Sequence, residues 1–568
     1  MKTLTPEQSA FLDALLMTNE NLVLEAVAGS GKSFTLEEGL RQMQTEGILP
    51  AGTLVCAFNK HIATAFQERA NTAGLPITVR TMNSLGHSAF GRAIGRRLTL
   101  ETGKLYLTAK ELWPRFDSSP MACPDFKKLV DAARNTGIVP AGSPGGAQDD
   151  TPAAWAELFE AADIDPEDWD PSWLIECART LLARMNMKAW EGIIDFTDQL
   201  YLPVTIAGRF DTFKLVMVDE VQDLGTLQHR MLRKLLGLSG RLVAAGDRNQ
   251  AIYGFRGADV RSIPNMIAQF GLRPMPLTVS FRCPKAVVRQ ANEIVPYMKS
   301  SPDAPEGLVG VSRPHEIRPG DFILCRYNQP LATLWLRLIK RGIAATILGK
   351  DIGAGLARLL KKRGASGDES MDLEVALKHL DSWLSSECTK HNEKGKLDKA
   401  ESLTDRCSAI HSICEAAPNG ATVRWFIDKI EALFSDRPGH PGMVTLSTIH
   451  KAKGLEYRRV HFLGREKLPP QRVRGAGRDQ ENNLIYVGET RAMSELYFMS
   501  IRSLAETNET ADLTVEDLFA PRPPKLPSVP SLAALTPDMS REEELQKQQK
   551  FLESRKTAGD LSIEDLGL

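Results

Sequence analysis

The stretch Ala26-Val27-Ala28-Gly29-Ser30-Gly31-Lys32-Ser33 predicts a phosphate-binding loop. It follows the apolar run 22–24 and precedes a helix-like stretch over 34–43, so the order is strand, glycine loop, helix. Glycines let backbone N–H groups curl around a phosphate, and a helix N-terminus favours negative charge. Lys32 would then reach the β- and γ-phosphates of a nucleotide, and Ser33 would hold Mg²⁺.

A pair of acids downstream supports this interpretation. The chain has Ala26 where the general pattern asks for Gly, and a Gly/Ser turn followed by chance by Lys-Ser is the alternative for the octet alone. The apolar run 215–218 ends in Asp219 and Glu220. Asp219 would hold Mg²⁺, directly or through water, and Glu220 would orient and deprotonate the attacking water. Acids after a buried strand also occur in plain turns, but their pairing with a phosphate loop favours catalysis.

Length and composition limit the classes of protein to which this chain can belong. A chain of 568 residues predicts three or four domains, and a net charge of −1 means that any nucleic-acid binding must use local patches. Eight cysteines without a Cys-x-x-Cys pair argue against zinc and against a disulfide framework, and suit a reducing compartment. Residues 1–7 lack the apolar core of a signal peptide, and no apolar run approaches membrane-spanning length. We therefore expect an intracellular protein that does not contact a membrane.

Apolar runs alternate with helical patterns along much of the chain. This alternation indicates parallel sheets covered on both faces, with ligands at the carboxyl ends of the strands. Residues 90–190 read as a helical insertion with five of the eight tryptophans, which we expect in its core, and 355–440 read as a smaller helical insertion. The proline-rich segment 521–537 predicts a linker, followed by a capped helix over 541–556. The acidic and apolar residues 562–568 are either a docking tail or a frayed terminus.

With its loop and acids, the chain resembles the UvrD/Rep family of superfamily 1 DNA helicases. The phosphate loop and Asp219-Glu220-Val221-Gln222-Asp223 are similar to the first two motifs of that family. The resemblance implies an α/β protein of the P-loop NTPase class, with two RecA-like parallel-sheet domains and helical insertions. The first domain would comprise 1–89 and 191–275, interrupted by the insertion 90–190. The second would comprise 276–354 and 441–505, interrupted by the insertion 355–440, and 506–568 would form the linker and tail.

Several motifs then imply contacts with ATP. Gln8 would read the adenine, although Thr5 and Gln8 also form a helix capping box. Phe281 would stack on the adenine, Glu456 would meet the ribose, and Gln250 would sense the γ-phosphate. Arg282 and Arg491 would act together as arginine fingers, an arrangement that contributes on the order of 10³–10⁵ in rate. By resemblance, the catalytic set is Lys32, Glu220, Gln250, Arg282 and Arg491, and the nucleotide contacts are Gln8, Ala28, Gly29, Ser30, Gly31, Lys32, Ser33, Phe34, Phe281, Arg282, Glu456 and Arg491.

Other motifs resemble the DNA-contacting segments of the family. The set is Phe58, Asn59, Lys60, Thr81, Tyr253, Phe255, Arg256 and His450. Stacking of bases on aromatic rings contributes about 1–3 kcal/mol per base without reading sequence, as a translocating motor requires. Core packing is the alternative for Tyr253 and Phe255. The segment 195–198 resembles an acidic segment of the family, and a basic loop is either solvated or contacts phosphates through Arg465, Lys467, Arg472, Arg474 and Arg478.

The resemblance implies an ATP- and Mg²⁺-dependent helicase that moves 3′→5′ on single-stranded DNA and unwinds duplex junctions in replication, repair or recombination. Ser280-Phe281-Arg282 and the segment 448–456 look closer to the F-box helicases, which favours a translocase that displaces proteins and unwinds weakly. An RNA-directed helicase and a binding module without ATPase activity are further alternatives. We expect a monomer, with a possible protein partner through the C-terminal tail. Its location would be cytoplasmic in a prokaryote or a virus-infected cell, and nuclear in a eukaryote.

Overall fold

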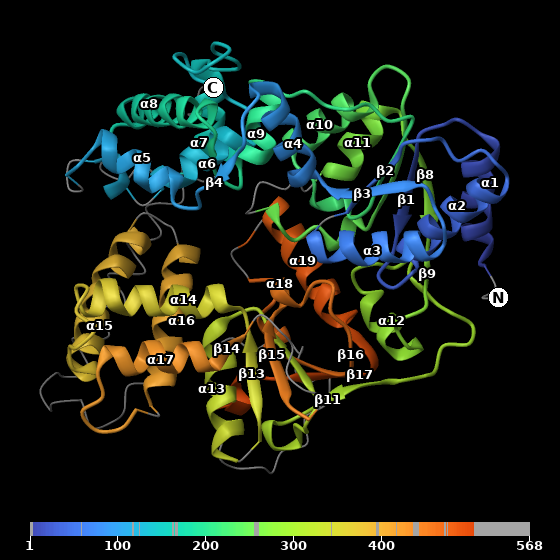
Figure 1. The fold of residues 1–568 in the computed structure, drawn as a ribbon. Coiled ribbons are helices and arrows are strands. Elements are labelled where there is room, and N and C mark those ends of the chain that lie inside the picture. The colour runs from blue at the N-terminus through green and yellow to red at the C-terminus, as the bar shows by residue number, and fades with distance from the viewer. Residues whose placement is uncertain are drawn as a thin grey trace, which may run out of the picture. The chain divides into compact units, whose positions relative to one another are not determined.

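The computed structural model describes residues 4–504, apart from 58, 116–118, 124, 162–163, 165–168, 255–260, 342, 394–396, 416, 436–441, 471–472 and 474. The linker, helix and acidic end predicted over 506–568 therefore lie outside the described residues. Two parallel sheets with helices around them make up most of the described chain (Figure 1). Among the helices of the described ranges, none combines the length and apolar character that a membrane span requires.

The first sheet has six strands in the order β3-β2-β6-β7-β1-β8, and every pairing is parallel. Its central strands read as continuous apolar runs because both of their faces are buried. Pro274 and Pro276 lie in β8, at the edge of the sheet, where a missing N–H donor is tolerated. The strands are β1 (Leu22–Ala26), β2 (Thr53–Ala57), β3 (Ile77–Thr81), β6 (Leu215–Val218), β7 (Arg241–Gly246) and β8 (Arg273–Leu277).

Helices cover both faces of this sheet. The alternating side chains of β1 show which helices pack on which face. Val23 packs into one apolar cluster and Leu24 into another, since alternate side chains of a strand point to opposite faces. The face of Leu24 is covered by α1 (Pro6–Met17), α2 (Lys32–Thr45) and α3 (Lys60–Thr72). The face of Val23 is covered by α4 (Met82–Ile94), α9 (Asp198–Thr205), α10 (Thr226–Leu236) and α11 (Ser262–Phe270).

The insertion after α4 is helical, as predicted, and has a core of its own around Trp155, which is fully buried. The expectation that its tryptophans are core residues is wrong for Trp173 and Trp190, which are 36% and 39% exposed. Both lie in the terminal turns of α8, beyond the buried stripe of that helix, and Trp173 stacks on Trp169. The elements are α5 (Lys104–Leu112), α6 (Phe126–Thr136), α7 (Pro152–Ala161), α8 (Pro171–Trp190) and the paired strands β4 (Thr99–Leu100) and β5 (Ile193–Ile194).

The second sheet has seven parallel strands in the order β11-β17-β16-β12-β15-β13-β14. The prediction of two RecA-like parallel-sheet domains with helical insertions is therefore confirmed. The strands are β11 (Leu308–Val311), β12 (Phe322–Cys325), β13 (Ala345–Leu348), β14 (Phe434–Ser435), β15 (Val444–Thr448), β16 (Tyr457–Leu463) and β17 (Ala492–Met499). A short pair, β9 (Val279–Ser280) and β10 (Lys299–Ser300), precedes them.

Two sets of helices pack on this second sheet. One cluster of apolar side chains joins the sheet to α12 (Lys285–Ala291), α18 (Ile449–Ala452) and α19 (Ala476–Glu489). A second cluster joins it to α13 (Asn328–Lys340), α14 (Lys350–Leu359), α15 (Leu373–Glu393), α16 (Leu397–Cys414) and α17 (Val423–Leu433). The first cluster also contains Val27, Ala28 and Ile252 from the first sheet's loops, so it spans both sheets.

Candidate nucleotide site

The glycine loop lies between β1 and the start of α2 at Lys32. Gly29 and Gly31 have φ of +74° and +81°, a left-handed conformation that costs an L-residue about 1–2 kcal/mol. A Cβ at Gly29 would lie 2.4 Å from the Cβ of Arg282, so the close approach also requires glycine. The buried Ser30 hydroxyl has no hydrogen-bond partner in the described structure, and α2 begins without a side-chain cap. A cradle with unused donors at a helix N-terminus fits an anion such as a phosphate.

The predicted catalytic acids meet the loop at the end of β6. Lys32 Nζ lies 2.7 Å from Glu220 Oε1 and 3.3 Å from Asp219 Oδ1. Ser33 Oγ donates to Asp219 Oδ2 at 2.8 Å, so the two predicted magnesium ligands are adjacent. Glu220 has φ of 58°, a strained conformation for a residue other than glycine and one that is typical of functional sites.

The charges at this point shift several pKa values. Burial alone would raise the pKa of Glu220, but Lys32 and Lys453 outweigh burial and hold this pKa at about 2. Burial raises the pKa of Asp219, and Lys32 only partly opposes it. Burial would lower the pKa of Lys32, yet Asp219 and Glu220 raise it well above its usual range. At neutral pH the site therefore contains a charged lysine and an ionised Glu220, which can accept a proton from a hydrogen-bonded water.

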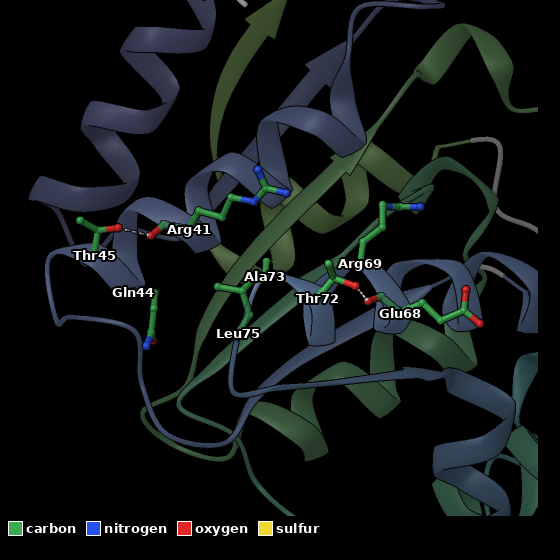
Figure 2. Close-up of a pocket in the computed structure, with 8 residues that line it drawn as sticks. All are labelled: Arg41, Gln44, Thr45, Glu68, Arg69, Thr72, Ala73 and Leu75. Carbon is green, nitrogen blue, oxygen red and sulfur yellow. Dashed lines mark hydrogen bonds between the residues drawn. The ribbon is translucent and has the colours of Figure 1, made fainter. Parts of the chain in front are cut away.

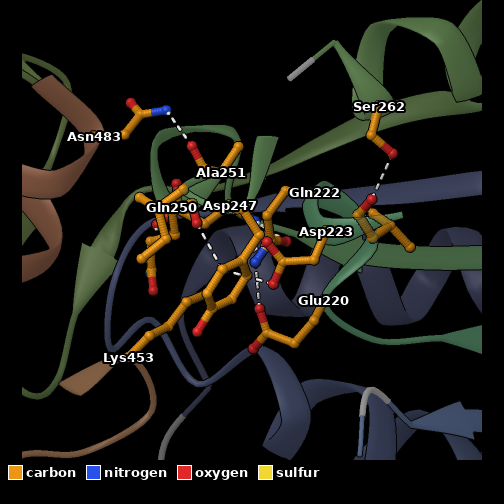
Figure 3. A network of polar contacts seen from close by, with 12 residues as sticks. Glu220, Gln222, Asp223, Asp247, Gln250, Ala251, Ser262, Lys453 and Asn483 are labelled. Atoms are coloured by element: carbon orange, nitrogen blue, oxygen red, sulfur yellow. Dashed lines mark hydrogen bonds and ion pairs between the residues drawn. The ribbon is translucent and has the colours of Figure 1, made fainter. Parts of the chain in front are cut away.

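A chain of polar contacts runs from Glu220 to Gln250 (Figure 3). Gln222 donates its amide to Glu220, and its oxygen accepts the N–H of Asp247 at 3.0 Å. Asp247 Oδ2 in turn accepts from Gln250 Nε2 at 2.7 Å. Burial raises the pKa of Asp247 to about 6, although Gln250 and Lys32 oppose the shift. The candidate base and the candidate γ-phosphate sensor are thus joined through two intermediate residues, Gln222 and Asp247.

Lys453 from the second sheet reaches the same region. It follows α18, and its Nζ lies 2.6 Å from Asp223 Oδ2 and 2.6 Å from the carbonyl oxygen of Gln250. Its ammonium group also lies 5.0 Å from the centre of the Tyr253 ring, a distance that fits a cation–π contact. Tyr253 Oη donates to the carbonyl oxygen of His450 at 3.0 Å. Two residues predicted to face DNA, Tyr253 and His450, are therefore in contact with each other, and Tyr253 also contacts Lys453.

Both predicted arginines line one cavity of about 370 Å³ together with the phosphate loop. Arg282 Nε donates to Glu456 Oε2 at 2.5 Å, which joins two of the predicted nucleotide contacts. Arg491 is buried, and its Nε donates to the carbonyl oxygen of Val487 at 2.8 Å. Burial and the nearby Arg282 lower the pKa of Arg491 to about 10, so it remains charged at neutral pH. Further lining residues are Ser33, Phe34, Asn59, Glu220, Asp223, Gln250, Tyr253 and Lys453.

The phosphate loop is bonded to the segment that leads toward the second sheet. Val27 N–H donates to the carbonyl oxygen of Leu277 at 2.9 Å, where β8 ends. Ser280 Oγ donates to the carbonyl oxygen of Ala28 at 2.8 Å, and Phe281 N–H donates to that of Gly29 at 2.9 Å. The loop and this segment are therefore held together by three consecutive contacts.

Gln8 and Phe281 both lie close to Gly31. A Cβ on Gly31 would come within 3.3 Å of Gln8 Nε2 and 3.9 Å of the Phe281 ring. Gln8 also forms the alternative capping box, because its side chain and that of Thr5 exchange hydrogen bonds with each other's backbone N–H groups. The cap and a position beside the loop are thus compatible, and base recognition by this pair stays a prediction.

The other predicted DNA contacts are dispersed. Asn59 caps α3 by accepting the N–H of Ile62 at 2.9 Å and lines the nucleotide cavity, whereas Lys60 is exposed. Thr81 caps α4 by accepting the N–H of Ser84 at 3.2 Å. Phe58, Phe255 and Arg256, as well as Arg472 and Arg474 of the basic loop, lie outside the described residues.

Two charged segments have structural roles. Arg465 of the basic loop is buried and donates to Glu489 Oε1 at 2.9 Å, so the prediction that it is solvated or contacts phosphates is wrong. The acidic segment 195–198 is buried against the helical insertion: Asp198 lies 2.5 Å from Lys104 Nζ and 2.8 Å from Arg134 Nη2. These ion pairs attach α5 and α6 to α9.

A second hollow of about 660 Å³ lies between the C-terminal ends of α2 and α3 (Figure 2). The phosphate loop is at the opposite end of α2, about 20 Å away for a helix of this length. Arg69 in the hollow is paired with Glu37 at 2.5 Å. The hollow is therefore separate from the nucleotide cavity. It is lined by Arg41, Gln44, Thr45, Glu68, Arg69, Thr72, Ala73 and Leu75.

Sequence reasoning gave no role to four residues that organise the site. Gln222, Asp247, Lys453 and Tyr486 all stand inside motifs that the resemblance covers. Asp247 had a detectable signal, since it directly follows an apolar strand, as Asp219 does. The positions of Lys453 and Tyr486 depend on how the second sheet meets the first, which residue spacing does not show.

A glycine loop after the first strand of a parallel sheet, with an acid at the end of a neighbouring strand, defines a P-loop α/β protein with two RecA-like sheets. Two family models match this chain: the UvrD/REP helicase N-terminal domain over residues 151–271 and the UvrD-like helicase C-terminal domain over 370–503. Over these two stretches the chain therefore matches both domains of the UvrD-like helicases.

Similar proteins include DNA helicase II of Haemophilus influenzae, 28% identical over 18% of this chain and 15% of that protein. The ATP-dependent DNA helicase PcrA of Bacillus subtilis is 22% identical over 54% of this chain and 59% of its own length. A probable DNA helicase II homologue of Rickettsia conorii is 22% identical over 88% of this chain and 93% of its own length. The first of these matches thus covers less than one fifth of the relative.

Proposed function

We propose that this chain is an ATP-dependent DNA helicase that moves 3′→5′ along single-stranded DNA and unwinds duplex DNA, in replication, repair or recombination. One observation supports it above the others. Lys32 and Glu220 follow strands of the first sheet, Arg282 follows β9, Arg491 precedes β17 of the second sheet, and all four line the same cavity. Such a site is complete only when the two sheets approach each other, so turnover depends on their approach. The names of the relatives agree with DNA as the substrate.

The residues present fit Mg²⁺ and ATP. The left-handed glycines, the unpartnered Ser30 hydroxyl and Lys32 suit the phosphates. Ser33 and Asp219 are adjacent and would hold Mg²⁺, which often takes only one or two protein ligands beside substrate phosphates. When bound, Mg²⁺ and ATP supply the phosphoryl group and neutralise its charge. Among the described residues no group of three or more His, Cys, Asp or Glu side chains forms a separate metal site.

Each side chain then has a role. Glu220, ionised at neutral pH, takes the proton of the attacking water, and Lys32 holds the phosphates beside it. Arg282 and Arg491 stabilise the charge that develops during transfer. Gln8, Phe281 and Glu456 hold the nucleoside.

The contacts of Lys453 supply a route from this chemistry to the DNA. Lys453 touches Asp223 and the Gln250 carbonyl on one side and the Tyr253 ring on the other. Tyr253 and His450 are the described candidates for DNA contact on this route. A movement of Gln250 during hydrolysis would therefore change the contacts of the Tyr253 ring through Lys453.

The test is ATP hydrolysis with and without single-stranded DNA. Glu220→Gln should lower the DNA-stimulated rate by about 10²–10⁴-fold, the usual contribution of a general base. Glu306→Gln is the matched control, since Glu306 is an exposed partner of Arg289 and does not line the nucleotide cavity. Absence of DNA stimulation in the wild-type protein would refute the proposal.

Further arms of the test separate the finer alternatives. Stimulation by RNA instead of DNA would indicate an RNA-directed helicase. Unwinding of duplexes with a 3′ tail but not a 5′ tail would support the direction. Weak unwinding together with efficient removal of a bound protein would indicate the protein-displacing translocase. We also propose that the chain acts inside the cell as a monomer, which sedimentation of the DNA complex would test.

A further inference from the structure

The Tyr486 hydroxyl connects three parts of the nucleotide site. Tyr486 lies on α19 and is fully buried in the apolar cluster that also contains Val27 and Ala28. Its oxygen accepts the N–H of Ala28, in the phosphate loop, at 2.7 Å. The same hydroxyl lies 3.3 Å from Asp247 Oδ2, to which it donates. A phenol has one donor and can accept as well, so one hydroxyl spans a helix of the second sheet, the phosphate loop and the end of β7.

Asp247 extends this connection to the cavity. The oxygen that accepts from Tyr486 also accepts from Gln250 Nε2 at 2.7 Å, and its other oxygen accepts the N–H of Asn249 at 3.0 Å. Tyr486 itself is absent from the cavity lining, whereas Gln250 and Asp247 are part of it. The hydroxyl thus acts on the cavity through other groups.

Two neighbours of Tyr486 hold α19 against the same segment. Gln480 donates to the carbonyl oxygen of Ile252 at 3.0 Å. Figure 3 shows the second contact, in which Asn483 donates to the carbonyl oxygen of Ala251 at 3.1 Å. The helix is therefore anchored to residues 247–252 at three points, and Tyr486 is the one that also reaches the phosphate loop.

We propose that Tyr486 is a positioning residue, which couples the approach of the second sheet to the shape of the phosphate loop and to the orientation of Gln250. Backbone N–H groups of such loops bind phosphate, so a hydroxyl that holds the Ala28 N–H sets the conformation of the loop. Tyr486 holds Asp247, and Asp247 in turn orients Gln250. A movement of α19 therefore acts on both the phosphate loop and Gln250 through one atom, the hydroxyl oxygen of Tyr486. This inference rests on the proposed ATPase, which it deepens.

Tyr486→Phe keeps the ring in its apolar cluster and removes only the hydroxyl. At saturating DNA, kcat for ATP should fall about ten-fold, as expected for the loss of one hydrogen bond to a charged group. KM for ATP should change less than kcat, because Tyr486 does not line the cavity and no direct contact with the nucleotide is removed. Tyr497→Phe is the matched control, since its hydroxyl is bonded to Glu495 on β17, outside the nucleotide cavity, and its kcat should stay at the wild-type value.

Hydrogen exchange of the Ala28 amide is a second, independent readout. Its protection in the wild-type protein should be lost in Tyr486→Phe and retained in Tyr497→Phe. A Tyr486→Phe protein with wild-type kcat and a protected Ala28 amide would overturn the inference while the proposed function stands.

If the wild-type protein shows no DNA-stimulated turnover, the proposed function fails, and amide exchange alone decides whether Tyr486 holds the loop. If Tyr486→Phe does not fold, rapid exchange of the Ala28 amide in the wild-type protein would overturn the inference, and slow exchange would support it.

Discussion

Lys453→Met should move the acid limb of the pH–rate profile to higher pH. Burial raises the pKa of Asp223 to about 6, although Lys453 Nζ, 2.6 Å away, opposes the shift. Below about pH 6 this carboxyl is therefore protonated and its ion pair with Lys453 is lost; above it the pair is complete. A cation within a few ångströms lowers the pKa of a carboxyl by about 1–3 units, so its removal should raise the pKa of Asp223 to between about 7 and 9.

The assay is DNA-stimulated kcat measured between pH 5 and pH 10. The wild-type protein should lose activity below about pH 6, where Asp247 also titrates. The variant should keep the Asp247 inflection and gain a second one in the range worked out above. Lys429→Met is the control, because Lys429 also lies over an aromatic ring, that of Trp335, but in another part of the chain. An acid limb that stays at the wild-type position in Lys453→Met would refute the reasoning, whatever happens to the maximal rate.

Two further substitutions test the phosphate loop. Lys32→Ala should lower ATP turnover by about 10²–10³-fold, the size of the loss when one preorganised charge-stabilising group is removed, and should leave DNA binding in a filter assay largely intact. Gly29→Ala should lower the free energy of unfolding by at least about 1–2 kcal/mol, because φ of +74° is unfavourable for alanine and the new Cβ would meet Arg282. Urea denaturation measures this loss, and a variant as stable as the wild-type protein would contradict it.

Local chemistry made the fold and part of the site predictable. Continuous apolar runs such as 215–218 indicate buried parallel strands, and Gly29 and Gly31 indicate left-handed turns. Both features can be predicted because each depends on only a few adjacent residues. Trp173 and Trp190 show that composition alone does not predict which residues are buried. A tryptophan is usually buried, but these two lie at helix ends beyond the apolar stripe.

The contacts between distant segments had no local signal. Ala28 and Tyr486 are 458 residues apart, and Asp223 and Lys453 are 230 apart. Residue spacing places Ala28 after β1 and Asp223 after β6, but it does not show which side chains of one sheet reach the loops of the other. Gln8 illustrates a related difficulty: one side chain serves as a cap and lies beside the loop, so a strong local explanation did not exclude a second role.

The bonds between the phosphate loop and residues 277–281 have a mechanical consequence. The single covalent connection from the first sheet to the second leaves β8 at Leu277, beside the loop itself. A movement of the phosphate loop would therefore act directly on this connection through the three hydrogen bonds that join them. Signals between the sheets then need no long relay through their cores. For the proposed motor, such a short connection would pass each movement of the loop from one sheet to the other with little loss.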